Sequence, residues 1–146
     1  MRLSFVHFIL ELNLWSVLGI DPECGRVLTE DLPLVNLANR LYRTVQTKNP
    51  QPDTLKQLRK ALNELEKINK ERNTLVHGFW TFPKDGLPSI VPKKGQVISK
   101  NAPTYSEITR LIEATDRFTE EFFKCMTKIY NPKLNLGSAP LLRTPD

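Results

Sequence analysis

Arg72, Asn73 and His77 bring a permanent positive charge, an amide and an imidazole together within a short stretch of the chain. They follow the apolar stripe of Leu58, Leu62 and Leu65, whose next helical steps fall near Asn69 and Arg72. A guanidinium on such a seam is costly unless it is paired or lines a wet cleft. The stretch from Arg72 to His77 is therefore the candidate site for binding and chemistry.

Helical geometry limits how these side chains act together. Asn73 and His77 are i,i+4 partners and share a face beside Arg72. Arg72 and His77 are separated by about 140° around an ideal helix. They converge on one ligand only from neighbouring positions, or from two copies of the helix across a dimer axis.

Glu11 is a second anomaly, because it is the only acidic residue in the apolar segment 3–18. A carboxylate in such a position usually has a cationic partner, and Arg72 is the natural candidate. The alternative is a boundary residue at the edge of a helix bundle. His7 lies one turn earlier and is read as a satisfied or partly exposed histidine.

Periodicity predicts an all-α fold, a four-helix up-and-down bundle with a small β-hairpin or irregular arm between its third and fourth helices. The expected helices span 3–18, a segment capped by Asp31 and closed by Asn49-Pro50, 53–79, and a segment opened by the Thr104/Glu107 capping box and ending at Tyr130. Residues 20–30 are expected to form a loop. The domain covers 1–130, with the arm at 80–100 and a disordered tail at 131–146. The first helix, apolar almost all round, belongs in the middle of the bundle or between two subunits.

Composition narrows the class of protein. The formal net charge is +5, which favours anionic partners and nucleic acid above all. Cys24 and Cys125 lie far apart and are read as small hydrophobic residues rather than a disulfide, which suits a cytoplasmic protein. The apolar start is interrupted by His7, Glu11 and Asn13, so no membrane association is expected. No metal site or cofactor is expected either, since two histidines are too few for a His-rich site.

The segment from Glu71 to Trp80, ERNTLVHGFW, resembles the signature of HEPN-domain proteins, an Arg and a polar residue followed by His after four to six intervening positions. These proteins are four- or five-helix bundles, so the architecture expected of residues 3–130 is compatible. The resemblance implies a metal-independent endoribonuclease acting on RNA as a homodimer, often a toxin or defence effector. It implies His77 as general acid or base, Arg72 on the phosphate and Asn73 as an orienting residue, with Glu11 in support. Lys70, Lys93 and Lys94 are candidate RNA contacts, and an antitoxin protein is a candidate partner.

A different class of function is also compatible with the sequence. A non-catalytic dimeric helical domain would bind a partner protein through the first helix and the apolar arm, where Trp80, Phe82, Ile90 and Val91 supply hydrophobic surface. Packing of those residues over the open end of the bundle is the alternative. A helix-turn-helix DNA binder is disfavoured, since no short helix pair with a tight glycine turn precedes a recognition helix.

Overall fold

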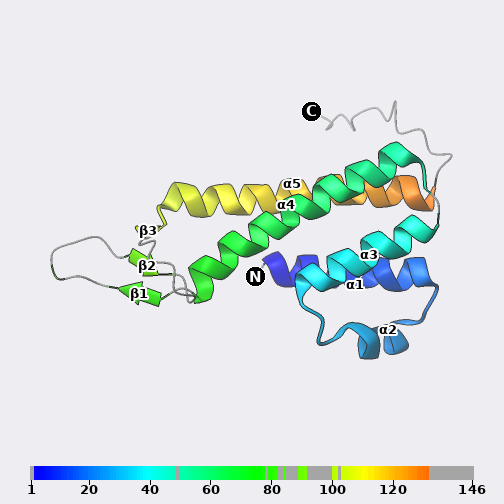
Figure 1. The fold of residues 1–146 in the computed structure, drawn as a ribbon, viewed down its shortest axis with the longest axis horizontal. Helices are drawn as coiled ribbons and strands as arrows, with labels where there is room; N and C mark the ends of the chain where they lie inside the picture. Colours follow the sequence, from blue (N-terminus) through cyan, green and yellow to red (C-terminus); the bar gives the residue numbers. More distant parts are fainter. Residues whose placement is uncertain are drawn as a thin grey trace, which may run out of the picture.

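The computed structural model describes residues 2–48, 50–77, 79–81, 84, 89–91, 100–101 and 103–131. Five α-helices lie in these ranges (Figure 1). Their bounds are α1 Arg2–Leu18, α2 Pro22–Thr29, α3 Leu34–Thr47, α4 Pro52–His77 and α5 Tyr105–Tyr130. Short strands β1 Phe79–Thr81, β2 Ser89–Val91 and β3 Lys100–Asn101 pair antiparallel in the order β1-β2-β3, with Trp80 opposite Ile90.

The segment expected to be a loop, 20–30, contains helix α2, which corrects the prediction of four helices. Gly19 ends α1 with a φ of 70°, a left-handed conformation that glycine adopts without strain. Asp21 then caps α2 by accepting hydrogen bonds from the backbone N–H groups of Glu23 and Cys24, with Pro22 in the first turn. Asp21 and Pro22 therefore start a helix where a loop was expected.

Because α2 carries the chain back, α1 and α3 run in the same direction (Figure 1). The start of α1 accordingly meets the start of α3, where His7 contacts the carbonyl of Leu32. Helices α4 and α5 are antiparallel, as the Glu71–Arg110 and Gln57–Lys128 contacts at their opposite ends require. The end of α5 lies beside the later part of α1, since Tyr130 donates a hydrogen bond to the carbonyl of Asn13. The topology thus differs from the predicted up-and-down order.

The core lies among α1, α3, α4 and α5. The predicted stripe of Leu58, Leu62 and Leu65 on α4 is buried, as are Leu37, Leu41 and Val45 on α3, whereas Leu34 and Leu55 are only partly covered. On α5, Phe118 and Phe122 are buried with their ring centroids 5.6 Å apart. The buried apolar residues are Val6, Ile9, Leu10, Leu14, Val17, Leu37, Ala38, Leu41, Val45, Leu58, Ala61, Leu62, Leu65, Ile68, Phe118, Phe122, Cys125 and Met126.

Helix α1 is not buried all round, so the expectation that it occupies the middle of the bundle is wrong. Its outward face leaves Phe5, Phe8 and Leu12 exposed, by 57%, 49% and 39% of their surface. Those positions follow the spacing of a single helix face. The alternative expectation, a helix at a subunit boundary, stays a prediction.

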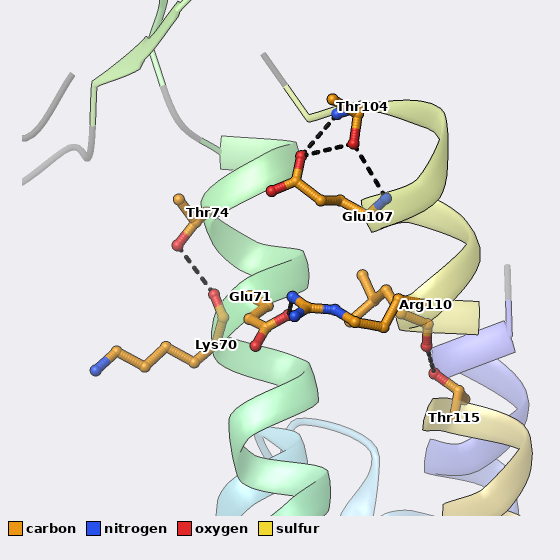
Figure 2. A network of polar contacts seen from close by, with 8 residues as sticks. Lys70, Glu71, Thr74, Thr104, Glu107, Arg110 and Thr115 are labelled. Atoms are coloured by element: carbon orange, nitrogen blue, oxygen red, sulfur yellow. Dashed lines mark hydrogen bonds and ion pairs between the residues drawn. The ribbon is translucent and has the colours of Figure 1, made fainter. Parts of the chain in front are cut away.

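Helix α5 begins as the sequence predicts. Thr104 caps it and shares a reciprocal capping box with Glu107, shown in Figure 2. Two apolar residues in its first half, Ile108 and Ile112, are exposed by 42% and 41%. Figure 1 shows the reason, since the end of α4 and the start of α5 extend beyond α1 and α3.

Within the described ranges, no single helix is long and apolar enough to cross a membrane. Ser4–Leu18 and Pro22–Thr29 pass such a test of length and composition only as a pair, and that pair is bent by 120° at its break.

Candidate functional site

An open pocket lies where the starts of α1 and α3 meet the later turns of α4. It is lined by Ser4, His7, Pro33, Leu34, Asn69, Arg72 and Asn73. Two residues of the predicted site, Arg72 and Asn73, therefore share one solvent-filled depression. Of the two environments expected for Arg72, a charged partner or a cleft, the described residues provide an open pocket.

Arg72 is half-buried, and its Nη1 donates a hydrogen bond to Oδ1 of Asn73 over 3.1 Å. No carboxylate of the described residues forms an ion pair with this guanidinium. Arginine carries five N–H donors in a planar fork, so most of the Arg72 donors are not used by the hydrogen bond to Asn73. An unpaired guanidinium in an open pocket suits an anionic ligand with several oxygens.

The start of α3 adds to the positive potential of the pocket. Its N-cap residue is Pro33, which makes no side-chain cap hydrogen bond, and its first turn holds no acidic residue. Asp31, predicted to cap this helix, does not do so. The unpaired N–H groups of a first helical turn carry a partial positive charge, which favours a nearby anion.

Glu11 does not pair with Arg72, which corrects the expectation from the sequence. Its Oε1 lies 2.8 Å from the hydroxyl of Thr29, which donates to it. The same hydroxyl accepts a hydrogen bond from Nε1 of Trp15 over 3.2 Å. These polar atoms lie between α1 and α2, because Gly25 allows α2 to approach the Trp15 ring: a Cβ at Gly25 would lie 2.5 Å from that ring.

His7 lies between the Glu11 contacts and the pocket. Its Nε2 is 2.9 Å from the carbonyl oxygen of Leu32, and its Nδ1 is 3.6 Å from Oε2 of Glu11. Both ring nitrogens thus face acceptor oxygens, and the contact of Nε2 with the Leu32 carbonyl is within hydrogen-bond distance. The interpretation of His7 as a satisfied, partly exposed residue agrees with these contacts. Its place in the wall of the pocket was not foreseen.

The remaining predicted site residues are only partly described. His77 is the last residue of α4, and its side chain lies outside the described residues, so its catalytic role stays a prediction. Lys70 is exposed, and Figure 2 shows its side chain directed away from α5. Lys93 and Lys94, like the side chains of Trp80, Phe82, Ile90 and Val91 and the tail from 132 onward, lie outside the described residues.

A second depression lies between α4 and α5, and its charges are mixed. Lys60, Arg117, Lys124 and Lys128 line it together with Glu64 and Glu121. Lys124 forms an ion pair with Glu121 over 2.8 Å, and this contact holds the pKa of the Glu121 carboxyl below its usual value. The two acidic groups offset two of the four basic side chains, so the groove keeps a surplus of two positive charges.

The cysteines and acidic residues offer no metal chemistry in the part of the chain that the structure describes. No group of three or more His, Cys, Asp or Glu side chains there is placed to hold a metal ion. Both cysteines are free, Cys125 in the core and Cys24 exposed at the start of α2. Burial raises the pKa of the Cys125 thiol, which disfavours its thiolate.

The chain was also compared with known proteins. No family model, no curated protein and no solved structure matches it. Functional inference therefore rests on the pocket and on the residues that line it.

Proposed function

We propose that the chain is a metal-independent endoribonuclease of the HEPN type that acts on RNA as a dimer, in the manner of a toxin or defence effector. The observation that supports the proposal is the pocket at Arg72. It joins a guanidinium that has no carboxylate partner among the described residues, the amide of Asn73 and the uncapped start of α3. These groups suit the phosphate of a nucleic-acid backbone.

In the proposed reaction, the ribose 2′-hydroxyl attacks the adjacent phosphorus. The 2′-oxygen loses its proton to a base as the new O–P bond forms, and the bond from phosphorus to the 5′-oxygen breaks. The 5′-oxygen takes up a proton, giving a 2′,3′-cyclic phosphate and a 5′-hydroxyl end. His77 serves as the acid or base, since an imidazole ionises near neutral pH. Arg72 offsets the charge that grows on the phosphate oxygens.

The dimer follows from the number of groups that the reaction needs. One His77 in each chain supplies one proton-transfer group, whereas the two transfers are best served by two. Arg72 and His77 also diverge around a single α4 helix. Two α4 helices facing one another would bring both histidines and both guanidinium groups to one phosphodiester.

A cleavage assay on single-stranded RNA with excess chelator tests this proposal. His77→Ala is expected to lower the cleavage rate by about 100-fold or more, the usual scale of acid–base catalysis. Arg72→Ala is expected to weaken both RNA binding and cleavage. Arg59→Ala is the matched control, because Arg59 is exposed on the same helix but stacks on Tyr42 outside the pocket. Equal cleavage by wild type and His77→Ala, or loss of cleavage on chelation, would remove the proposal.

The alternative is a non-catalytic dimeric interaction domain that binds a partner protein. Helix α2 supports it, because its adjacent residues Val27 and Leu28 are exposed by 75% and 57%. Val27→Asp would then abolish partner binding while Arg72→Ala leaves it intact. The reverse pattern, with RNA binding lost only in Arg72→Ala, would favour the ribonuclease.

A further inference from the structure

The depression between α4 and α5 is a long groove with walls from both helices. Its lining runs from Gln57 to Ile68 on α4 and from Ala114 to Lys128 on α5. At 1.5 Å per residue, these spans are about 17 Å and about 21 Å long. Because α4 and α5 are antiparallel, the two walls face each other over three to four helical turns.

The floor of this groove is apolar and recessed. Ile68 and Phe118 are only 5% and 4% exposed, so they close the floor and do not project from it. Ala61, Ala114 and Cys125 complete the apolar lining. Their side chains are small, so the space above the floor remains open. The floor therefore suits an occupant that presents a narrow row of apolar side chains.

The rim of the groove has two basic side chains that are not neutralised. Its acidic residues are both engaged, because Glu64 pairs with Lys67 over 2.7 Å and Glu121 pairs with Lys124 over 2.8 Å. Lys60 and Arg117, by contrast, take part in no ion pair among the described residues. They come from opposite walls of the groove, Lys60 from α4 and Arg117 from α5.

Charges just outside the lining do not cancel this surplus. Lys56 and Lys67 follow the outer side of the α4 wall, and Glu113 and Glu120 follow the outer side of the α5 wall. Two positive and two negative charges balance, so the surplus of two positive charges within the lining determines the sign of the potential.

We infer that the groove binds an amphipathic α-helix of a partner protein, with acidic residues on both sides of its apolar stripe. The apolar stripe would lie on the floor, and the acidic residues would face Lys60 and Arg117. Placement of one apolar helix face in a groove is a recurrent mode of peptide recognition. The length of the walls matches three to four turns of such a helix.

The groove is less suited to a single strand of nucleic acid. Proteins bind such strands by stacking bases on exposed aromatic rings along a positive channel. Phe118 is the aromatic residue of the lining, and at 4% exposure its ring offers no face for stacking. Glu64 and Glu121 would also repel phosphates, whereas an amphipathic helix has no charge along its apolar stripe.

This inference goes beyond the proposed ribonuclease and does not depend on it. The groove and the Arg72 pocket share no lining residue. Glu64, in the groove, and Asn73, in the pocket, are separated by about 180° around an ideal helix. Two α4 helices that face one another through the turns bearing Arg72 would therefore leave the groove open to a partner.

A designed peptide tests the groove. The probe is a fluorescein-labelled 14-residue peptide, about 21 Å long as a helix, with leucines at i, i+3 and i+4 spacing and glutamates on both flanks. Fluorescence anisotropy with the full chain should give a dissociation constant on the order of 10 μM, as for a small transient interface. One control peptide has lysines in place of the glutamates, and another has serines in place of the leucines. Both should bind at least tenfold more weakly.

Variants of the chain place the binding in the groove. Arg117→Glu should weaken binding of the acidic peptide about tenfold, and the effect should shrink at high salt. Arg43→Glu is the matched control, with the same change of charge at an exposed residue of α3 outside the groove, and it should bind as wild type does. Glu121→Gln should tighten binding, because it removes an acidic group and releases Lys124. Far-ultraviolet circular dichroism verifies that the variants fold.

The inference would be overturned if the acidic peptide did not bind, or if Arg117→Glu and Arg43→Glu lost affinity equally. Equal losses would mean that the peptide responds only to the net charge of the chain. Loss of RNA binding in Arg117→Glu with unchanged peptide binding would assign the groove to nucleic acid instead. Arg72→Ala and Val27→Asp should both bind the peptide normally, which separates this groove from the two functions proposed above.

Discussion

Two clusters of polar residues interrupt apolar helix faces in this molecule, and they differ in how far the protein satisfies their hydrogen bonds. At the α1–α2 contact, Glu11, Thr29 and Trp15 satisfy one another in a largely buried arrangement. At the pocket, Arg72 makes one hydrogen bond to Asn73 and is open to solvent, without a carboxylate partner among the described residues. The first cluster holds a helix in place, whereas the second has donors left for a ligand.

The difference shows that a charged residue on an apolar seam does not by itself identify a functional site. Glu11 and Arg72 break the pattern in the same way, and sequence reasoning joined them as a pair. The two residues differ in whether the protein itself satisfies their hydrogen-bonding groups. A buried polar group must find its partners within the protein, as Glu11 does, whereas Arg72 keeps donors that face the pocket. Substitutions should thus affect stability at one cluster and ligand binding at the other.

The largest loss of stability is expected from Gly25→Ala. The added Cβ would lie 2.5 Å from the Trp15 ring, so α2 must move away from α1. Overpacking of this kind costs about 3 kcal/mol of the free energy of unfolding. Urea denaturation followed by circular dichroism measures the loss. An unchanged midpoint would mean that α2 is not docked on Trp15.

A smaller loss is expected from Thr29→Val, which keeps the shape of the side chain but removes its hydroxyl. Glu11 then loses a donor and Trp15 Nε1 loses its acceptor. Leaving such groups without partners costs about 2 kcal/mol. Thr44→Val is the matched control. The Thr44 hydroxyl donates an exposed hydrogen bond to the Arg40 carbonyl of the preceding helical turn. Equal losses in the two variants would contradict a special role for Thr29.

Arg72→Gln should change stability by less than about 0.5 kcal/mol, because Arg72 pairs with no carboxylate among the described residues. Its effect should appear in ligand binding instead, with RNA affinity falling about tenfold. Fluorescence anisotropy with labelled RNA measures the affinity, and the wild-type value should also fall steeply with salt. A variant that unfolds readily but binds RNA normally would reverse the roles assigned to the two clusters.

The smallest effect concerns pH and the cap of α2. The backbone N–H of Cys24, followed by its thiol and the N–H of Glu23, lowers the pKa of Asp21 from 3.8. The folded chain therefore holds the ionised carboxylate more strongly than the unfolded chain does. The resulting contribution to the free energy of unfolding is present above the pKa that Asp21 has in the unfolded chain. It is lost as the pH falls through the lower pKa that Asp21 has in the folded chain.

Asp21→Asn tests this expectation, since asparagine caps a helix without ionising. The melting temperatures of wild type and variant should differ slightly near neutral pH and converge as the pH falls below 3.8. A difference that stays constant on acidification would show that ionisation of Asp21 does not contribute.

Local signals in the sequence predicted much of the fold. The Thr104/Glu107 capping box and the stripe of Leu58, Leu62 and Leu65 are confirmed, because caps and periodicity depend on residues close in the chain. The missed helix α2 shows the limit of such signals. Asp21 and Pro22 suit a turn and a helix start equally, and the choice depends on a distant contact, that of Gly25 with Trp15.

The candidate site was predictable only in part. Arg72 and Asn73 were found because they are neighbours in one helix. His7 and the start of α3 were not assigned to the site. They reach the pocket because α1 and α3 run in the same direction, and the periodicity of apolar residues does not indicate the direction in which two helices pack. The partner expected for Glu11 was wrong for the same reason, since Thr29 belongs to a helix that was not anticipated.

The hydrogen bond between Tyr130 and Asn13 has a consequence for the order of folding. It joins residues 117 positions apart, so the chain must close a very long loop before the contact is made. Contacts among α1, α2 and α3 close much shorter loops. We therefore expect the end of α5 to dock on α1 late in folding, so that loss of this contact should speed unfolding more than it slows folding.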